Sequence, residues 1–115
     1  MIKIYGIKNC ETMKKAFAWL TEHGIAYDFH DYKKAGVDAE TLGRWAEKSD
    51  WKTLVNTRGT TWRKLAPEEQ ALDTLEQAIA LMVAKPSVIR RPIVEMPDGA
   101  LIVGFDPARF EVLLA

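Results

Sequence analysis

Cysteine is nearly absent from this sequence of 115 residues, which contains one cysteine and two histidines. A single cysteine excludes an internal disulfide and a metal site built from a cysteine cluster. No run approaches about eighteen consecutive apolar residues, so hydropathy excludes a membrane-spanning helix. The start of the chain has no apolar segment followed by a small-residue cleavage site, and we expect no export signal. Together these absences favour the reducing cytoplasm.

The sequence also lacks a net charge, because sixteen Lys and Arg residues balance sixteen Asp and Glu residues. Such a chain has no overall field that attracts nucleic acid or a membrane surface, and we expect neither as a partner. Hydrophobic residues make up 48% of the chain, with four Trp, four Phe and three Tyr, which excludes a disordered chain. The length fits one domain, residues 1–115, and we expect a monomer.

The first part of the chain combines a short strand and a helix around the single cysteine. The apolar run Ile2–Tyr5 predicts a buried strand that Gly6 ends, and Asn9 is a good N-cap for a helix over residues 11–23. The apolar residues of that helix share one face: Met13, Ala16, Phe17 and Leu20. Cys10 therefore lies where the first helical turn presents unpaired N–H groups and the positive end of the helix dipole.

A thiolate in that position is favoured over a thiol, so we expect the pKa of Cys10 to lie below the free value of about 8.5. Lys8 would lower this pKa further, whereas Glu11 would oppose the effect. The neighbouring residues, which include Asn9 and Thr12, are polar, and such a segment is not typical of a core. Cys10 is therefore a candidate nucleophile. The alternative is an inert buried cysteine.

The rest of the chain changes its hydrophobic period twice. Residues 25–32 alternate apolar and polar side chains, which predicts a second strand and, with the preceding helix, a βαβ unit. Residues 38–89 have mostly helical patterns. Residues 93–96 and 100–103 flank a Pro-Asp-Gly turn and predict a β-hairpin, after which Asp106 starts a final helix. The order is thus strand, helix, strand, helical insert, two strands and helix.

The helical insert contains several start signals. Asp38 is expected to cap one helix, Pro67 to occupy the first position of another, and Asp73 with Glu76 to form a capping box. The helix after this box is expected to bury one face: Leu75, Ile79, Met82 and Val83. Residues 33–36 are expected to form a basic turn, and residues 51–55 are expected to form a short connector with an apolar end.

This order of elements, with a nucleophile at the start of the first helix, is similar to the thioredoxin fold, an α/β fold with a mixed sheet. Three segments narrow the resemblance: Tyr-Gly-Ile-Lys-Asn-Cys10 followed by Glu-Thr-Met-Lys-Lys-Ala16, Asn56-Thr-Arg-Gly-Thr-Thr-Trp62, and Arg90-Arg-Pro-Ile-Val94. In this order and approximate spacing they resemble the ArsC/Spx family of arsenate reductase-like proteins, in its YffB branch. The resemblance covers essentially the whole chain.

The resemblance implies a thioredoxin-like core of about residues 1–34 and 88–115. It also implies an all-helical insert, about residues 38–87, between the second and third strands. The whole would form a single domain.

The resemblance also implies roles for particular residues. Cys10 matches the reactive cysteine, and Arg91 matches the arginine that binds an oxyanion near the sulfur in arsenate reductases. Pro92 matches a proline that is typically cis in thioredoxin-like folds; the alternative is a plain proline at a strand start. Arg58 aligns with an arginine of the Spx branch, while Asn56 competes with it for the family's second anion-binding position.

The sequence departs from the family pattern at three places. The strand after the hairpin turn, residues 101–104, has no cation where arsenate reductases carry a further arginine. Gly6 stands where their reactive loop has a histidine, and Met13 stands where Spx members can carry the second cysteine of Cys-x-x-Cys. Arsenate is therefore not expected as the main substrate, and any catalytic cycle must use an external thiol.

The YffB resemblance implies a glutathione-dependent thiol–disulfide reductase, with Cys10 as nucleophile and a second thiol that resolves the mixed disulfide. Glutathione is the expected co-substrate, the partner is a small-molecule or protein disulfide, and no metal is expected. The expected glutathione-binding residues are Lys8, Asn9, Arg58, Arg91 and Pro92. Two alternatives are an Spx-like module that binds RNA polymerase without turnover and a thiol sensor that becomes glutathionylated. His23 and His30 are less favoured as a base for Cys10.

Overall fold

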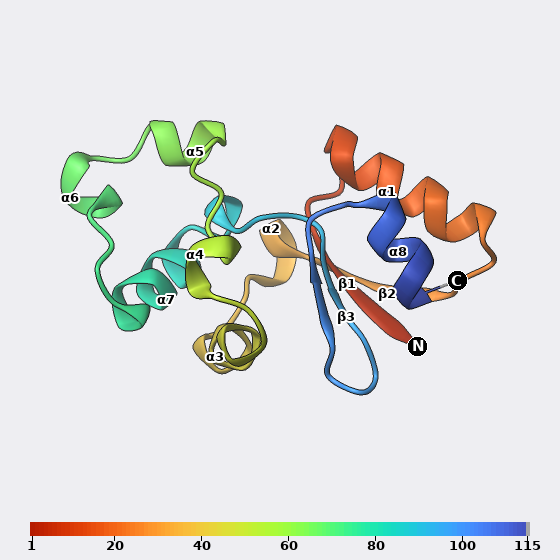
Figure 1. Ribbon diagram of the computed structural model, residues 1–115. Helices are drawn as coiled ribbons and strands as arrows, with labels where there is room; N and C mark the ends of the chain where they lie inside the picture. Colours follow the sequence, from red (N-terminus) through yellow and green to blue (C-terminus); the bar gives the residue numbers. More distant parts are fainter. Residues whose placement is uncertain (115) are drawn as a thin grey trace. The chain divides into compact units, whose positions relative to one another are not determined.

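The computed structural model describes residues 1–114 and contains one four-stranded sheet with helices. Contacts between residues divide the chain into two compact units (Figure 1). The first unit comprises Met1–Asp31 and the segment from Arg91 onward, and the second comprises Tyr32–Arg90. The second unit is inserted between the second and third strands in chain order, as the sequence predicted.

The sheet belongs to the first unit and is mixed. Its strands are β1 (Ile2–Gly6), β2 (Tyr27–Asp31), β3 (Ile93–Glu95) and β4 (Leu101–Val103). They lie in the order β2-β1-β3-β4, with β1 parallel to β2 and antiparallel to β3, and with β3 antiparallel to β4. The predicted βαβ unit and the predicted β-hairpin are both confirmed.

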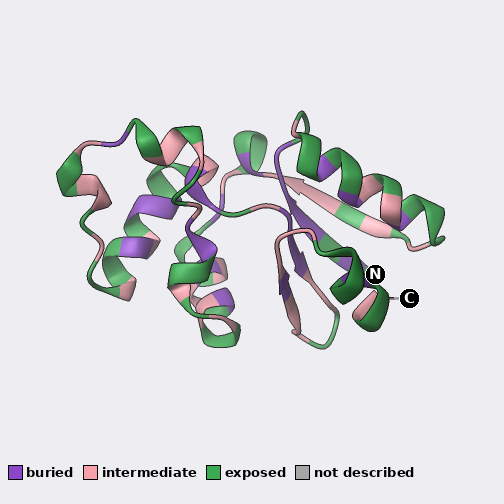
Figure 2. Ribbon diagram, turned by 45° about the horizontal axis from the view of Figure 1, so that its top comes forward, coloured by how far each residue is buried: buried purple, intermediate pink, exposed green. Residues whose placement is uncertain are grey.

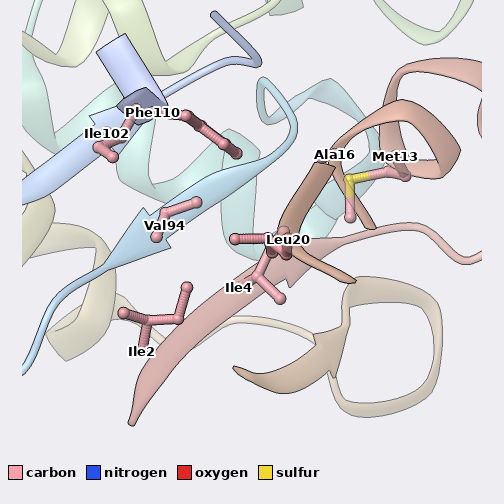
Figure 3. Packing of buried hydrophobic residues seen from close by; sticks show 8 residues of the cluster. All are labelled: Ile2, Ile4, Met13, Ala16, Leu20, Val94, Ile102 and Phe110. Atoms are coloured by element: carbon pink, nitrogen blue, oxygen red, sulfur yellow. The ribbon is translucent and has the colours of Figure 1, made fainter. Parts of the chain in front are cut away.

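Two helices supply the core of the first unit, α1 (Glu11–Glu22) and α8 (Pro107–Leu114). Alternate residues of a strand point to the same face, so Ile2 and Ile4 of β1 face the helices together. Figure 3 shows the resulting cluster: Ile2, Ile4, Met13, Ala16, Leu20, Val94, Ile102 and Phe110. The predicted buried face of α1 is confirmed, with Phe17 packed against it and partly buried.

Three expectations about this unit were wrong in detail. Gly6 does not end β1 but continues it, because it still pairs with Asp31 of β2. The N-cap of α1 is Cys10 rather than Asn9, with φ −133° and ψ 134°. The second strand begins later than predicted, because the backbone N–H of Ile25 is still bonded to the carbonyl of Leu20, 2.9 Å away.

The second unit consists of short helices. These are α2 (Tyr32–Ala35), α3 (Ala39–Lys48), α4 (Trp51–Leu54), α5 (Thr60–Arg63), α6 (Pro67–Gln70), α7 (Leu75–Ala84) and the 3₁₀ turn η1 (Pro86–Val88). The predicted turn at residues 33–36 and the predicted connector at residues 51–55 are mostly helical instead, because α2 and α4 occupy them. Asp38 caps α3 through its Oδ1, which accepts from the N–H of Thr41 at 2.8 Å, and Pro67 begins α6, as predicted.

Helix α7 starts one residue later than predicted. The capping box of α7 is formed by Thr74 and Gln77, not by Asp73 and Glu76. Its buried residues are Ala78, Leu81 and Met82. Val83 was expected in the core but is 43% exposed.

Buried residues of the second unit run along several of its helices and the segments between them (Figure 2). The largest are Tyr32, Trp45, Leu42, Leu54, Met82 and Ile89. An isolated antiparallel bridge between Val55 and Ile89 ties the end of α4 to the residue after η1. Over residues 1–114, no helix is both long and apolar enough to cross a membrane.

Candidate active site around Cys10

Cys10 sits at the junction between the exit of β1 and the start of α1. Its extended backbone is that of an N-cap residue, and its carbonyl accepts the first helical hydrogen bond, from the N–H of Lys14 at 2.9 Å. An N-cap side chain lies beside the second and third N–H groups of its helix, here those of Thr12 and Met13. The thiol is half-buried, so the sulfur is not enclosed in the core.

Partial burial and three neighbouring groups set the charge state of this sulfur. Partial burial raises the pKa of Cys10, but the backbone N–H of Met13, the side chain of Arg91 and the backbone N–H of Thr12 lower it, and together they outweigh burial. Neither N–H group forms an N-cap hydrogen bond of ordinary length and angle with the side chain of Cys10. The pKa of Cys10 therefore lies below that of an ordinary thiol, which favours the nucleophilic thiolate.

The strand register explains why Arg91 reaches Cys10. In the antiparallel pair of β1 and β3, Tyr5 lies opposite Ile93. The end of β1 and the start of β3 are thus at the same edge of the sheet. Arg91 precedes that start by two residues, and Cys10 follows that end closely. The guanidinium hydrogen-bonds the thiol and adds its positive charge.

Pro92 is buried next to this arginine. The peptide bond between Arg91 and Pro92 is cis, which agrees with the expectation from the family resemblance. The carbonyl of Pro92 accepts from the N–H of Gly104 at 2.8 Å, and this bond holds the segment against the end of β4.

Lys8 and Asn9 are exposed in the loop that leads to Cys10. Lys8 was expected to lower the pKa of Cys10, but it is not among the described groups that do so. The binding of glutathione by these two residues stays a prediction.

Arg58 and Asn56 belong to the second unit. Arg58 is exposed, whereas Asn56 is half-buried and shapes its own loop. The Oδ1 of Asn56 accepts from the N–H of Arg58 at 3.2 Å, and the N–H of Asn56 donates to the carbonyl of Val88 at 2.7 Å. Asn56 thus has a structural task in this unit. Which of the two fills the family's second anion-binding position stays a prediction.

Neither histidine is among the described groups that shift the pKa of Cys10. His23 caps the opposite end of the twelve-residue helix α1, about 18 Å along the axis from the cysteine, so it cannot act as its base. Its Nδ1 lies 2.8 Å from the carbonyl of Trp19 and its Nε2 lies 3.5 Å from Glu111. His30 packs against the ring of Tyr5 in the sheet, with centroids 4.9 Å apart.

Comparison with known proteins identifies the relatives of this chain. The model of the ArsC family matches residues 5–113. The chain belongs to the ArsC family. One curated relative is an uncharacterized protein of Haemophilus influenzae, 41% identical over all of both chains. Another is the global transcriptional regulator Spx of Streptococcus agalactiae, 27% identical over 99% of this chain and 83% of Spx.

Solved structures agree with this assignment. The YffB protein is 49% identical, with a TM-score of 0.95 over all of both chains. An arsenate reductase (ArsC) related protein from Brucella melitensis is 52% identical, with a TM-score of 0.76 over 97% of this chain and 92% of that chain. The expected ArsC/Spx membership and the mixed α/β fold with its helical insert are thus confirmed. At family level, ArsC membership supports a thiol reductase or an Spx-like regulator.

Sequence reasoning placed Cys10 at the start of the first helix, where the structure has it, but did not name the amides that lower its pKa. The N–H groups of Thr12 and Met13 were predicted only as unnamed donors of the first turn. The signal was present, because an N-cap at Cys10 makes these residues the second and third of the helix. Placing the cap at Asn9 would have selected Glu11 and Thr12 instead.

Proposed function

We propose that this protein is a glutathione-dependent thiol–disulfide reductase in which Cys10 is the nucleophile. One observation carries the proposal: the amides of Thr12 and Met13 and the guanidinium of Arg91 converge on the only thiol and lower its pKa. A thiolate that remains half-exposed can reach an incoming disulfide. Such a cycle uses reduced glutathione, and the cytoplasm is where we propose that it runs.

The cycle needs two thiol–disulfide exchanges. In the first, the Cys10 thiolate attacks the glutathione sulfur of a mixed disulfide between a substrate and glutathione, and the substrate leaves as its thiolate. In the second, a glutathione thiolate attacks the Cys10–glutathione disulfide and releases oxidised glutathione and the Cys10 thiolate. Over the cycle, the substrate sulfur is reduced from disulfide to thiolate, and the sulfur of the one incoming glutathione is oxidised from thiolate to disulfide.

The proposed binding groups are cations and polar residues near the start of α1. Arg91 suits a glutathione carboxylate, because its planar guanidinium can donate two parallel hydrogen bonds. Lys8, Asn9 and the backbone at Pro92 would add contacts. Arg58 belongs to the second unit and is proposed as a glutathione-binding residue from the family resemblance alone. An exposed ion pair contributes only about 0–1 kcal/mol, so affinity requires several of these contacts.

Mass spectrometry and a coupled assay test the proposal. The protein is first treated with oxidised glutathione, and we expect one glutathione adduct on wild type and none on Cys10→Ser. Reduced glutathione should then remove the adduct. In an assay coupled to glutathione reductase, wild type should turn over small disulfides and Cys10→Ser should not. Equal rates for the two proteins would reject the proposal.

A second candidate function is an Spx-like regulatory module. The similarity to Spx over 99% of this chain favours it. Such a module would bind RNA polymerase through its surface, and its binding would survive Cys10→Ser. Polymerase capture by both wild type and Cys10→Ser, without thiol turnover, would favour this candidate. An adduct that reduced glutathione does not remove would indicate a thiol sensor instead.

A further inference from the structure

Gly6 lies in the buried part of β1, directly beside the side chain of Met13. A Cβ built on Gly6 would overlap the Sδ and Cε atoms of Met13 and would lie 3.3 Å from its Cγ. Both residues are buried, and Met13 has no exposed surface. The methionine side chain therefore occupies the space that any side chain at position 6 would need.

The backbone does not explain this glycine. Positive φ angles, which favour glycine, occur at Gly24, Gly36, Gly99 and Gly104, and Gly6 is not one of them. Alanine would be accepted by the backbone of Gly6. The observation that remains is the close approach of Met13.

Met13 carries two contacts of different kinds. Its side chain packs in the cluster of Figure 3 with Ala16, Leu20 and Ile4, and its backbone N–H acts on the sulfur of Cys10. Because interiors are close-packed, a side chain with no exposed surface cannot give way without moving its neighbours or its own backbone. A side chain at position 6 would therefore require the Met13 side chain to shift, together with its neighbours in the cluster or the first turn of α1.

We propose that Gly6 is a positioning residue for the active cysteine: because it has no side chain to collide with Met13, the first turn of α1 can approach β1 and keep the Met13 amide beside the Cys10 sulfur. The inference rests on the proposed function of Cys10. Gly6 acts through Met13 and does not itself touch the sulfur.

The test is the pKa of Cys10, measured from thiolate absorbance against pH with Cys10→Ser as the blank. We expect Gly6→Ala to raise this pKa by about half a unit, which lowers the rate of alkylation at neutral pH roughly threefold. The double variant Gly6→Ala with Met13→Ala removes the colliding atoms and keeps the amide, so it should return the pKa toward the wild-type value. Gly43→Ala is the matched control, because a Cβ there meets nothing within 4 Å.

The outcomes separate this inference from the proposed function. A low wild-type pKa that Gly6→Ala leaves unchanged would overturn the positioning role and leave the reductase proposal intact. A wild-type pKa at the free-thiol value would instead overturn the reductase proposal. If Gly6→Ala does not fold, the double variant decides: a folded protein with the wild-type pKa supports the role, and any other result rejects it.

Discussion

At the scale of single residues, the charge on one sulfur depends on groups from two places in the chain. The amides of Thr12 and Met13 are local, and they follow from the N-cap position of Cys10. Arg91 is distant in sequence, and only the pairing of β1 with β3 brings it to the thiol. Helix position could be predicted from the sequence alone, whereas the contact of Arg91 required the family resemblance.

Removing the guanidinium should weaken the thiolate. We expect Arg91→Ala to raise the pKa of Cys10 by about one unit, because both a hydrogen bond and a positive charge are lost. The rate of adduct formation with oxidised glutathione at neutral pH should fall about tenfold. Arg90→Ala is the control, since the Nε of Arg90 donates to the carbonyl of Thr53 at 3.0 Å. If both variants react alike, Arg91 has no special role.

The lowered pKa also predicts how stability depends on pH. Between the pKa of Cys10 in the folded protein and about 8.5, the unfolded chain binds more protons than the folded chain. Stability from this group is therefore present above that window and is lost as pH falls through it. Urea midpoints measured across the window should rise with pH more steeply for wild type than for Cys10→Ser. Parallel curves would show that the folded and unfolded pKa values are equal.

At the scale of elements, segments with a readable pattern or turn were predicted and short helices were not. Alternation or helical spacing predicted β2, α1 and α8, and an apolar run predicted β1. The Pro-Asp-Gly turn predicted the three-residue strands β3 and β4 on either side of it. The four-residue helices α2 and α4 have a single turn each, which is too short to show a period. For α7, the sequence pattern placed the N-cap one residue too early. The pattern also predicted Val83 on the buried face, whereas the structure buries Leu81.

The two positions of the α7 cap can be distinguished by substitution. The Oγ1 of Thr74 accepts from the N–H of Gln77 at 3.2 Å, so Thr74→Ala should lower the free energy of unfolding by about 1 kcal/mol. Asp73 takes part through its backbone N–H, which donates to Gln77, and alanine retains this group. Asp73→Ala should therefore change stability by less than about 0.5 kcal/mol. Chemical denaturation measures both, and a larger loss for Asp73→Ala would restore the original prediction.

At the scale of the whole molecule, the order of elements was enough to predict the fold. The sequence order of strands and helices led to a mixed sheet with a helical insert, and the family match and solved relatives agree with it. The number of cysteines is also a property of the whole chain: with only one, an oxidised Cys10 has no partner for a disulfide within the same chain. The expected monomeric state stays a prediction.

The single cysteine predicts which products oxidation should form. Because the half-exposed Cys10 can pair only with another molecule, the oxidant diamide should produce disulfide-linked pairs of chains. Reduced glutathione should convert these pairs to monomers. Non-reducing electrophoresis should show the pairs for wild type and not for Cys10→Ser. A pair that persists in Cys10→Ser would show a contact that does not involve the thiol.

The most direct test of the central claim is the pKa of Cys10 in the wild-type protein. Thiolate absorbance followed from acid to alkaline pH reports only this sulfur, because the chain has no other cysteine. The convergence of Arg91 and the α1 amides predicts a midpoint below about 8.5. A midpoint at or above that value would contradict the account.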